Sequence, residues 1–408
     1  MNKKRICIAA SALALGLMSG VSASAAETIN FWFPTFASAD GEVTDEEFWN
    51  GVMEKFEEEN DCEVNVTIVP WDNYEEKYMT GTMATDGPDV GYLYMEMFYD
   101  YIDNGMLTDI DSYFTDEQKE NYIYYDLGNL LGGQYALPVV VGNPRILVAN
   151  MDILNEAGIT EVPKTLDELV EACEKIKESN PDVAPFMQDW GNAHYGSLNE
   201  IYWPFFWSEG GQIVDDEGNL TIDSAEGLAA TEFIYSLKEK GILDDTCTAC
   251  DDTIEPFKNG EVAMTFMASS NALRVDTVNW DYSAVLSGSK DAQTFVAADC
   301  LVMFDTCENK DLAAKLMAYA TSAEVMSQFH KQVSEQPPIT LDEEYEGDER
   351  FATLFTEYGD NFKSLPVFKS ASSMYDQLFK NLQMMMLDQK TPQEVLTETT
   401  EYYNSNLS

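Results

Sequence analysis

The sequence has few cationic side chains and almost no histidine. Its 408 residues include 23 lysines and arginines against 73 aspartates and glutamates, and its 2 histidines are His194 and His330. The net charge of −50 argues against nucleic acid and anionic membrane surfaces as partners, because both are bound through clustered Lys and Arg. It also disfavours an anionic ligand. Because like charges repel one another, we expect a soluble monomer with an acidic, solvated surface.

Motifs of the common enzyme classes are also missing. The chain has no G-x-S-x-G nucleophile elbow, no H-E-x-x-H zinc motif and no P-loop. We therefore predict a protein that is not an enzyme and that uses no cofactor. Carboxylates are so numerous that they neither support nor exclude a glycosidase pair, so a secreted glycoside-active enzyme remains an alternative.

Cysteine is sparse, and its spacing gives little support for a metal site. Of 7 cysteines, Cys7 lies in the N-terminal segment described next, and Cys247-Thr-Ala-Cys250 is the one C-x-x-C pair. A zinc site needs a second such pair or a histidine pair. We predict no metal site, and the pair is interpreted as a local disulfide or as two free thiols.

No hydrophobic run is long enough to span a membrane. The longest begins the chain: Lys3, Lys4 and Arg5 precede an apolar core from Ile6 to Met18, and Ala23-Ser24-Ala25 fits a small-residue cleavage site. Residues 1–26 therefore have the pattern of a secretion signal. Val21 stands where a lipidated cysteine would follow Leu17-Met18-Ser19-Gly20, so we expect an exported protein, periplasmic or at the cell surface, and the sequence does not support a lipid anchor.

The first hundred residues alternate between strand and helix patterns. Strands are predicted over Thr28–Phe33, Val64–Ile68 and Asp89–Leu93, with helices between them. This alternation predicts a parallel sheet. Ligands of such sheets lie beyond the carboxyl ends of the strands, which nominates three loops: Phe33–Phe36, Pro70–Asp72 and Tyr94–Met97.

The most informative stretch runs from Gly132 to Ile176. A Gly-Gly turn is followed by Tyr135-Ala-Leu-Pro138, two short apolar runs, an Asn150-Met-Asp152 helix start and a Thr165-x-x-Glu168 capping box. This ordered series resembles the lobe-crossing segment of the extracellular solute-binding proteins of ABC importers, the maltose-binding-like and largely sugar-binding kind. Further along, Phe257–Met264, Glu335–Pro338 and the last predicted helices also resemble that family.

The resemblance implies an α/β fold of the two-lobed periplasmic-binding-protein type (type II). Each lobe would be a mostly parallel sheet flanked by helices, and the lobes would be joined by crossing strands. We expect residues 27–141 and 297–338 to form lobe 1, and residues 142–296 and 339–408 to form lobe 2. The lobes should close on the ligand about Val139–Asn143 and Phe295–Asp299.

Candidate ligand-binding residues come from the three loops and from the resemblance. The loops supply Phe33, Thr35, Trp71 and Tyr94. The resemblance implies further cleft positions: Glu96, Asn143, Arg145, Ser270, Asp299 and Tyr375. Trp190 lies alone in a polar stretch and is interpreted as either an exposed stacking platform or a packing residue. By contrast, Tyr202–Trp207 predicts a helix that buries its rings.

The family likeness favours one function. It implies the substrate-binding component of an ABC importer, which captures a sugar or oligosaccharide and delivers it to membrane permease subunits. We expect a neutral carbohydrate that stacks on aromatic rings and hydrogen-bonds to polar side chains. A polyamine, a peptide or another small solute remains an alternative ligand, because the acidic charge favours a cation.

Overall fold

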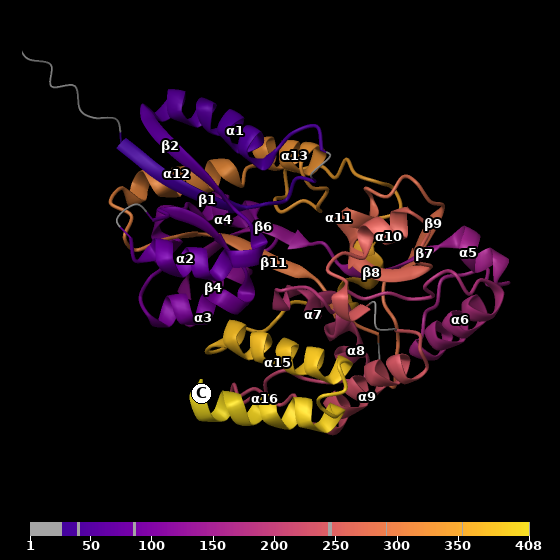
Figure 1. The fold of residues 1–408 in the computed structure, drawn as a ribbon. Coiled ribbons are helices and arrows are strands. Elements are labelled where there is room, and N and C mark those ends of the chain that lie inside the picture. Colours follow the sequence, from indigo (N-terminus) through magenta and orange to yellow (C-terminus); the bar gives the residue numbers. More distant parts are fainter. Residues whose placement is uncertain are drawn as a thin grey trace, which may run out of the picture.

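The computed structural model describes residues 27–38, 41–84, 87–243, 247–290, 292–352 and 354–407. The expected secretion signal lies outside them. The chain forms two lobes, each with its own sheet and covering helices (Figure 1). Within the described ranges, no helix is both long enough and apolar enough to cross a membrane.

The first lobe is built on a five-stranded sheet with the order β2-β1-β3-β11-β6. Its strands are β1 (Glu27–Pro34), β2 (Cys62–Val69), β3 (Val90–Leu93), β6 (Ala136–Gly142) and β11 (Ala297–Met303). The first three pair in parallel, as the strand–helix alternation predicted, and β11 runs antiparallel to both β3 and β6. A segment from late in the chain thus completes a sheet begun at its start.

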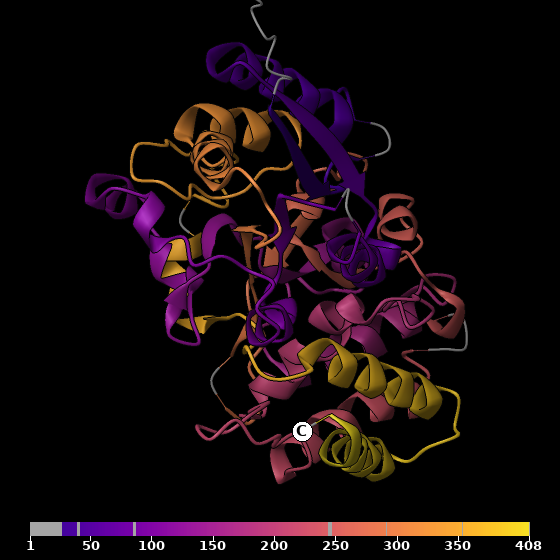
Figure 2. The ribbon, with the colours of Figure 1, turned by 90° about the vertical axis from the view of Figure 1, so that its left-hand side faces the viewer.

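Helices cover this sheet on both sides (Figures 1 and 2). They are α1 (Asp45–Asn60), α2 (Tyr74–Thr82), α3 (Met95–Asp103), α4 (Asp116–Asn121), α12 (Lys310–Ala320) and α13 (Ala323–Gln332). A capping box begins α1: the Glu47 amide donates to the Thr44 hydroxyl at 3.1 Å, and the Glu47 carboxylate accepts from the Thr44 amide at 3.1 Å. The chain turns at Thr321, which separates α12 from α13.

The second lobe contains a three-stranded sheet with the order β8-β7-β9. Strand β7 (Arg145–Asn150) lies between β8 (Met264–Ala268) and β9 (Trp280–Ser283) and is antiparallel to both. Parallel pairing in this lobe occurs between the short segments Thr294–Phe295 and Phe362–Lys363 and at isolated bridges such as Ala184 with Val262. The mostly parallel sheet expected in each lobe is therefore found in strands β1, β2 and β3 of the first lobe, whereas the main sheet of the second lobe is antiparallel.

Larger and smaller helices surround this second sheet. They are α5 (Met151–Glu156), α6 (Leu166–Ser179), α7 (Leu198–Ile201), α8 (Trp203–Ser208), α9 (Ala225–Glu239), α10 (Ile254–Lys258), α11 (Ser269–Ala272), α14 (Leu354–Tyr358), α15 (Ala371–Met386) and α16 (Pro392–Asn406). As predicted, the rings of α8 are buried. The yellow pair α15 and α16 packs beside α8 and α9 (Figure 1). At α6, the Thr165 hydroxyl caps the Glu168 amide, but the Glu168 carboxylate accepts from the Lys164 amide and not from Thr165.

The remaining regular elements are short. They are β4 (Asn129–Leu130), β5 (Gly133–Gln134), β10 (Thr294–Phe295), β12 (Phe362–Lys363), and the 3₁₀ turns η1 (Trp71–Asn73), η2 (Asp111–Tyr113), η3 (Tyr125–Gly128), η4 (Tyr195–Ser197), η5 (Cys247–Ala249) and η6 (Gly359–Asn361). Near η5, Cys250 is a buried free thiol whose Sγ–H donates to the Asp252 carbonyl at 3.2 Å. Of the two interpretations of the C-x-x-C pair, the structure therefore does not contain the disulfide.

Two of the crossings between the lobes pass through irregular backbone. In the first, Gly142 ends β6 with φ +139° and Asn143 follows with φ +53°. In the second, β10 leads into β11, and the pairing of β11 with β6 shifts register between Asp299 and Cys300. Both crossings lie where hinge motion was predicted.

Candidate functional site

A cavity of about 490 Å³ lies between the two lobes. The first lobe contributes the loops that follow its three parallel strands, as expected from the rule that ligands bind beyond the carboxyl ends. These loops supply the lining residues Thr35, Phe36, Trp71, Asp72, Tyr94 and Glu96.

The second lobe supplies the opposite wall and most of the polar groups. One group of lining residues precedes or belongs to α7: Asp189, Asn192, His194, Ser197, Asn199 and Glu200. Another follows β8: Ser270, Asn271 and Arg274. The crossings themselves add Asn143, Arg145, Phe295 and Asp299.

Most of the candidate residues from the sequence lie on this cavity. Those that line it are Thr35, Trp71, Tyr94, Glu96, Asn143, Arg145, Ser270 and Asp299. Phe33, Trp190 and Tyr375 do not line it, because each is buried in a hydrophobic core.

Trp190 shows why the platform interpretation is wrong. Its side chain is 1% exposed, and its indole N–H donates to the Gln188 amide oxygen at 3.0 Å. Gln383 on α15 also donates to the Trp190 carbonyl at 2.8 Å. The polar neighbours that suggested exposure are thus the partners that allow this ring to be buried.

Phe33 and Tyr375 are packing residues for similar reasons. The Phe33 ring lies inside the core of the first lobe, with its centroid 4.5 Å from that of Trp49. Tyr375 on α15 packs against Trp203 at 5.4 Å and Tyr195 at 6.1 Å between centroids. Neither ring can stack on a ligand without opening a core.

Arg145 organises the crossing side of the cavity. Its Nε donates to the Glu200 carboxylate at 2.5 Å, its Nη1 donates to the Asn143 carbonyl at 2.8 Å, and its guanidinium carbon lies 4.9 Å from the Phe295 ring centroid. Burial raises the pKa of Glu200, and the Arg145 ion pair opposes that rise. Asn143 in turn accepts from the Ser270 amide at 3.1 Å. These contacts fix the positions of Asn143 and Arg145 at the hinge.

Three further carboxyl groups of the cavity also have raised pKa values. Burial, together with the negative charges of Asp299 and Glu75, raises the pKa of Glu96 to about 8. Burial raises the pKa of Asp299 to about 7, although the Tyr92 hydroxyl donates to it at 2.5 Å. Burial and the charge of Glu200 raise the pKa of Asp189 to about 7. Perturbed carboxyl groups gathered in one cavity are typical of functional sites.

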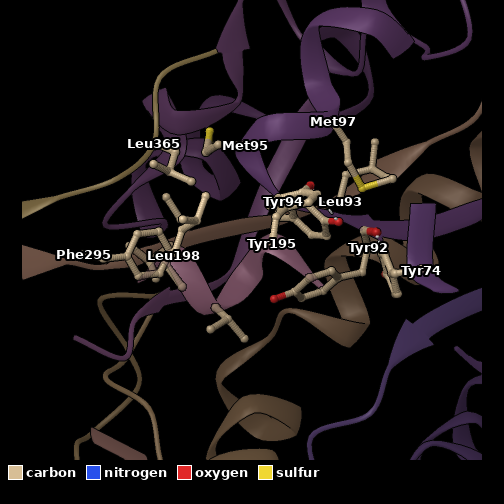
Figure 3. Close-up of a cluster of buried hydrophobic side chains, with 14 of the residues drawn as sticks. Tyr74, Tyr92, Leu93, Tyr94, Met95, Met97, Tyr195, Leu198, Phe295 and Leu365 are labelled. Atoms are coloured by element: carbon tan, nitrogen blue, oxygen red, sulfur yellow. Dashed lines mark hydrogen bonds between the residues drawn. The ribbon is translucent and has the colours of Figure 1, made fainter. Parts of the chain in front are cut away.

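A junction of polar groups joins the lobes beside the cavity, and the sequence did not reveal it. Glu75 on α2 accepts from the Tyr195 hydroxyl at 2.6 Å, contacts His194 Nε2 at 3.1 Å, and also accepts from the Tyr94 hydroxyl. Burial alone would raise the pKa of Glu75, but the hydrogen bonds from His194, Tyr195 and Tyr94 lower it to about 2. Figure 3 shows Tyr94 beside Tyr195, with Tyr74 and Tyr92 to one side and Leu198 and Phe295 to the other.

Arg274 forms a second bridge between the lobes that the sequence did not reveal. From the segment after β8, its Nη2 donates to the Phe36 carbonyl at 2.9 Å and to the Val333 carbonyl at 2.8 Å, both in the first lobe. Neither bridge has a local sequence signature, because the partners lie far apart along the chain. The two bridges show the lobes in contact across the cavity.

Comparisons with known proteins agree with this architecture. A protein of Brucella abortus (strain 2308), provisionally named a binding protein, is 25% identical over 372 residues, which are 86% of this chain and 87% of that protein. An ABC-transporter solute-binding protein of Thermotoga lettingae, solved with α-D-tagatose, superposes with a TM-score of 0.78 at 21% identity, covering 93% of this chain and 99% of that one. The GacH receptor of Streptomyces glaucescens, studied with acarbose, also gives 0.78, at 20% identity, covering 94% and 98%.

The structural neighbours share the two-lobed fold found here. The family assignment comes from the sequence, because the family of bacterial extracellular solute-binding proteins matches residues 40–327. That range includes both crossings, the loops after the parallel strands and all of the cavity-lining groups described above except Thr35 and Phe36. The chain therefore belongs to the bacterial extracellular solute-binding proteins.

Proposed function

We propose that this protein captures a sugar or oligosaccharide between its lobes and delivers it to the permease subunits of an ABC importer. The observation that carries the proposal is the cavity between the lobes. It is lined by two aromatic rings, the partly exposed Trp71 and the largely buried Tyr94, and by hydrogen-bonding side chains on both walls. Sugar rings present apolar faces to aromatic rings and hydroxyl groups to polar side chains.

The relatives support this ligand class. One structural neighbour was solved with tagatose, and another was studied with acarbose. Trp71 is held in place for such a role: its indole N–H donates to the Thr35 carbonyl at 2.6 Å, and its ring meets that of Phe36 at 5.7 Å between centroids. A ring held in this way can stack on a ligand without losing further side-chain freedom.

The remaining parts of the proposal concern how the protein works. It acts as an exported monomer without catalytic activity, and it binds no nucleic acid. Residues 27–141 with 297–338, and 142–296 with 339–408, move as lobes about the two crossings. The left-handed backbone conformation of Asn143, with φ +53°, and the register shift at Asp299 support hinges there, because irregular backbone absorbs rotation in few residues.

Calorimetric titration of the purified protein against a broad glycan panel tests the proposal. A saccharide should bind with one site per chain, and solution scattering should show a smaller radius of gyration in the complex than in the free protein. Mass spectrometry of the incubated ligand should find it uncleaved. Failure of every saccharide to bind contradicts sugar capture, and cleaved product contradicts a purely binding role.

A further inference from the structure

Acidic side chains outnumber cationic ones on the lining of the cavity. Among the described residues that line it, seven carry carboxylates and two carry guanidinium groups. Both guanidinium groups are already engaged with the protein: Arg145 pairs with Glu200, and Arg274 donates to main-chain carbonyls. A bound ligand therefore meets more carboxyl groups than cationic groups.

Glu96 is a buried acidic side chain of the cavity with few interaction partners. It lines the cavity and is only 7% exposed. Within the described ranges, the hydrogen bond that its carboxylate receives comes from its own backbone N–H. Burial therefore favours the neutral acid, with a pKa of about 8, and a cation placed in the cavity beside Glu96 would favour its ionised form and be held by it.

Asp299 adds a second carboxylate near Glu96. One of its oxygens accepts from the Tyr92 hydroxyl, and the group lines the same cavity. The two carboxyl groups disfavour each other's charge, as the raised pKa of Glu96 shows. Arg145 compensates both in part, but its Nε is committed to Glu200. Neutral hydroxyl groups would leave the remaining repulsion in place.

We propose that the ligand is an amino sugar whose protonated amine binds at Glu96 and Asp299 while its ring stacks on the aromatic residues of the cavity. The inference rests on the proposed function and narrows its ligand class. An ammonium group supplies three N–H donors and one positive charge, which matches two acidic side chains. Trp71 and Tyr94 supply the apolar surface that a sugar ring needs and that a simple polyamine would not use.

A metal ion fits the same charge less well. The described residues contain no group of three or more His, Cys, Asp or Glu side chains placed to hold one. Divalent cations such as Ca²⁺ require six to eight oxygen ligands in one place. The carboxylates of this cavity are instead distributed over both walls, as suits a ligand of the size of a sugar.

The test compares sugars that differ at one substituent. Calorimetric titration is run with amino sugars and amino-oligosaccharides, with their N-acetylated forms and with the parent sugars that carry a hydroxyl at the same carbon. Calcium alone and spermidine are included as cation controls. Charge-assisted hydrogen bonds are about twice as strong as neutral ones, so the amine should bind about tenfold tighter than its parent. Its affinity should fall as the ionic strength rises toward about 0.5 M, because salt screens the attraction.

Two variants locate the effect. Glu96→Gln keeps the shape and hydrogen-bonding capacity of the side chain but removes its charge, so the amine should lose about tenfold in affinity and the parent sugar little. Asp299→Asn serves as a second, independent variant in case the first folds poorly. Asp103→Asn is the matched control: Asp103 ends α3, the helix that carries Glu96, and is exposed outside the cavity lining, so removing its charge should change amine affinity by less than about threefold, as screening at exposed sites predicts.

The outcomes distinguish the amino-sugar inference from the proposed sugar capture. Tighter binding of the amine that is lost in Glu96→Gln supports the inference. Equal or tighter binding of the neutral parent overturns the inference and leaves the proposed sugar capture standing. Binding of spermidine or calcium without any saccharide overturns both, as does a panel in which no saccharide binds.

Discussion

Replacing Glu75 by glutamine should weaken the contact between the lobes. The carboxylate lies on α2 of the first lobe, and two of its three partners, His194 and Tyr195, lie in the second. Glutamine is nearly the same size and can still hydrogen-bond to the tyrosine hydroxyls. The variant therefore removes the negative charge and leaves the packing in place.

The pKa of Glu75 sets the size of the effect. Its value falls from the ordinary 4.5 to about 2 in the folded protein. One pKa unit corresponds to about 1.4 kcal/mol, which puts an upper limit of about 3 kcal/mol on the stabilisation. The side chain is 28% exposed, so solvent screening reduces the expected value to about 2 kcal/mol.

The direction of the pH dependence follows from the lowered pKa of Glu75. A carboxylate with a lower pKa in the folded state stabilises that state above the unfolded pKa, and the stabilisation disappears as pH falls through the folded pKa. The wild-type protein should therefore lose this contribution between about pH 5 and pH 2. The variant carries no carboxylate at this position and should not show that part of the acid dependence.

Urea unfolding at pH 7, 5 and 3.5 measures the difference. The free energy of unfolding of Glu75→Gln should lie about 2 kcal/mol below wild type at pH 7, and the gap should narrow as the pH falls. Glu76→Gln is the matched control, because Glu76 is the exposed next residue on the same helix. Equal stability of Glu75→Gln and wild type at pH 7, or a gap that does not narrow in acid, would refute the reasoning.

Four further substitutions separate binding from packing and hinge geometry. Trp71→Ala should weaken sugar binding by about one power of ten with little change in melting temperature, because a stacking ring contributes about 1–3 kcal/mol. Trp190→Ala should instead lower the free energy of unfolding by about 3–5 kcal/mol, because that ring is 1% exposed. Titration and thermal melting separate the two effects, and similar effects of both substitutions would contradict the assignment. Gly142→Ala should cost about 1–3 kcal/mol and reduce closure seen by scattering, since φ is +139°; normal stability and closure would count against a strained hinge. Arg145→Met leaves Glu200 buried without its cation and should destabilise the protein by about 3–5 kcal/mol, measured by chemical unfolding, and a neutral effect would show that the pair is dispensable.

Local patterns in the sequence predicted the elements that carry the site. The parallel strands β1, β2 and β3 have short apolar runs that fit buried strands, and their helices begin at side-chain caps such as Thr44. Once these strands are known, the loops after them follow, because parallel strands end at the same edge of a sheet. This reasoning reached Thr35, Trp71 and Tyr94, which line the cavity.

The errors among the aromatic residues have one physical cause. A ring in a polar stretch and a ring in a core can have the same sequence neighbours, because polar groups can turn inward to satisfy an indole N–H. At Trp190 that group is Gln188, two residues away, and the ring is enclosed further by α15. Burial of this kind depends on distant segments and leaves no local signal.

The sequence by itself determined the strands, the capped helices, the acidic surface and the loops at the carboxyl ends of the first sheet, because each depends on neighbours within a few residues. Only the tertiary structure decided which charges are compensated. Glu75 meets His194 across 119 positions and Arg145 meets Glu200 across 55, whereas Glu96 remains in the cavity without a cation of its own. The net charge of −50 could not reveal this difference, since the state of each carboxylate depends on its burial and on the groups that folding brings within a few ångströms of it.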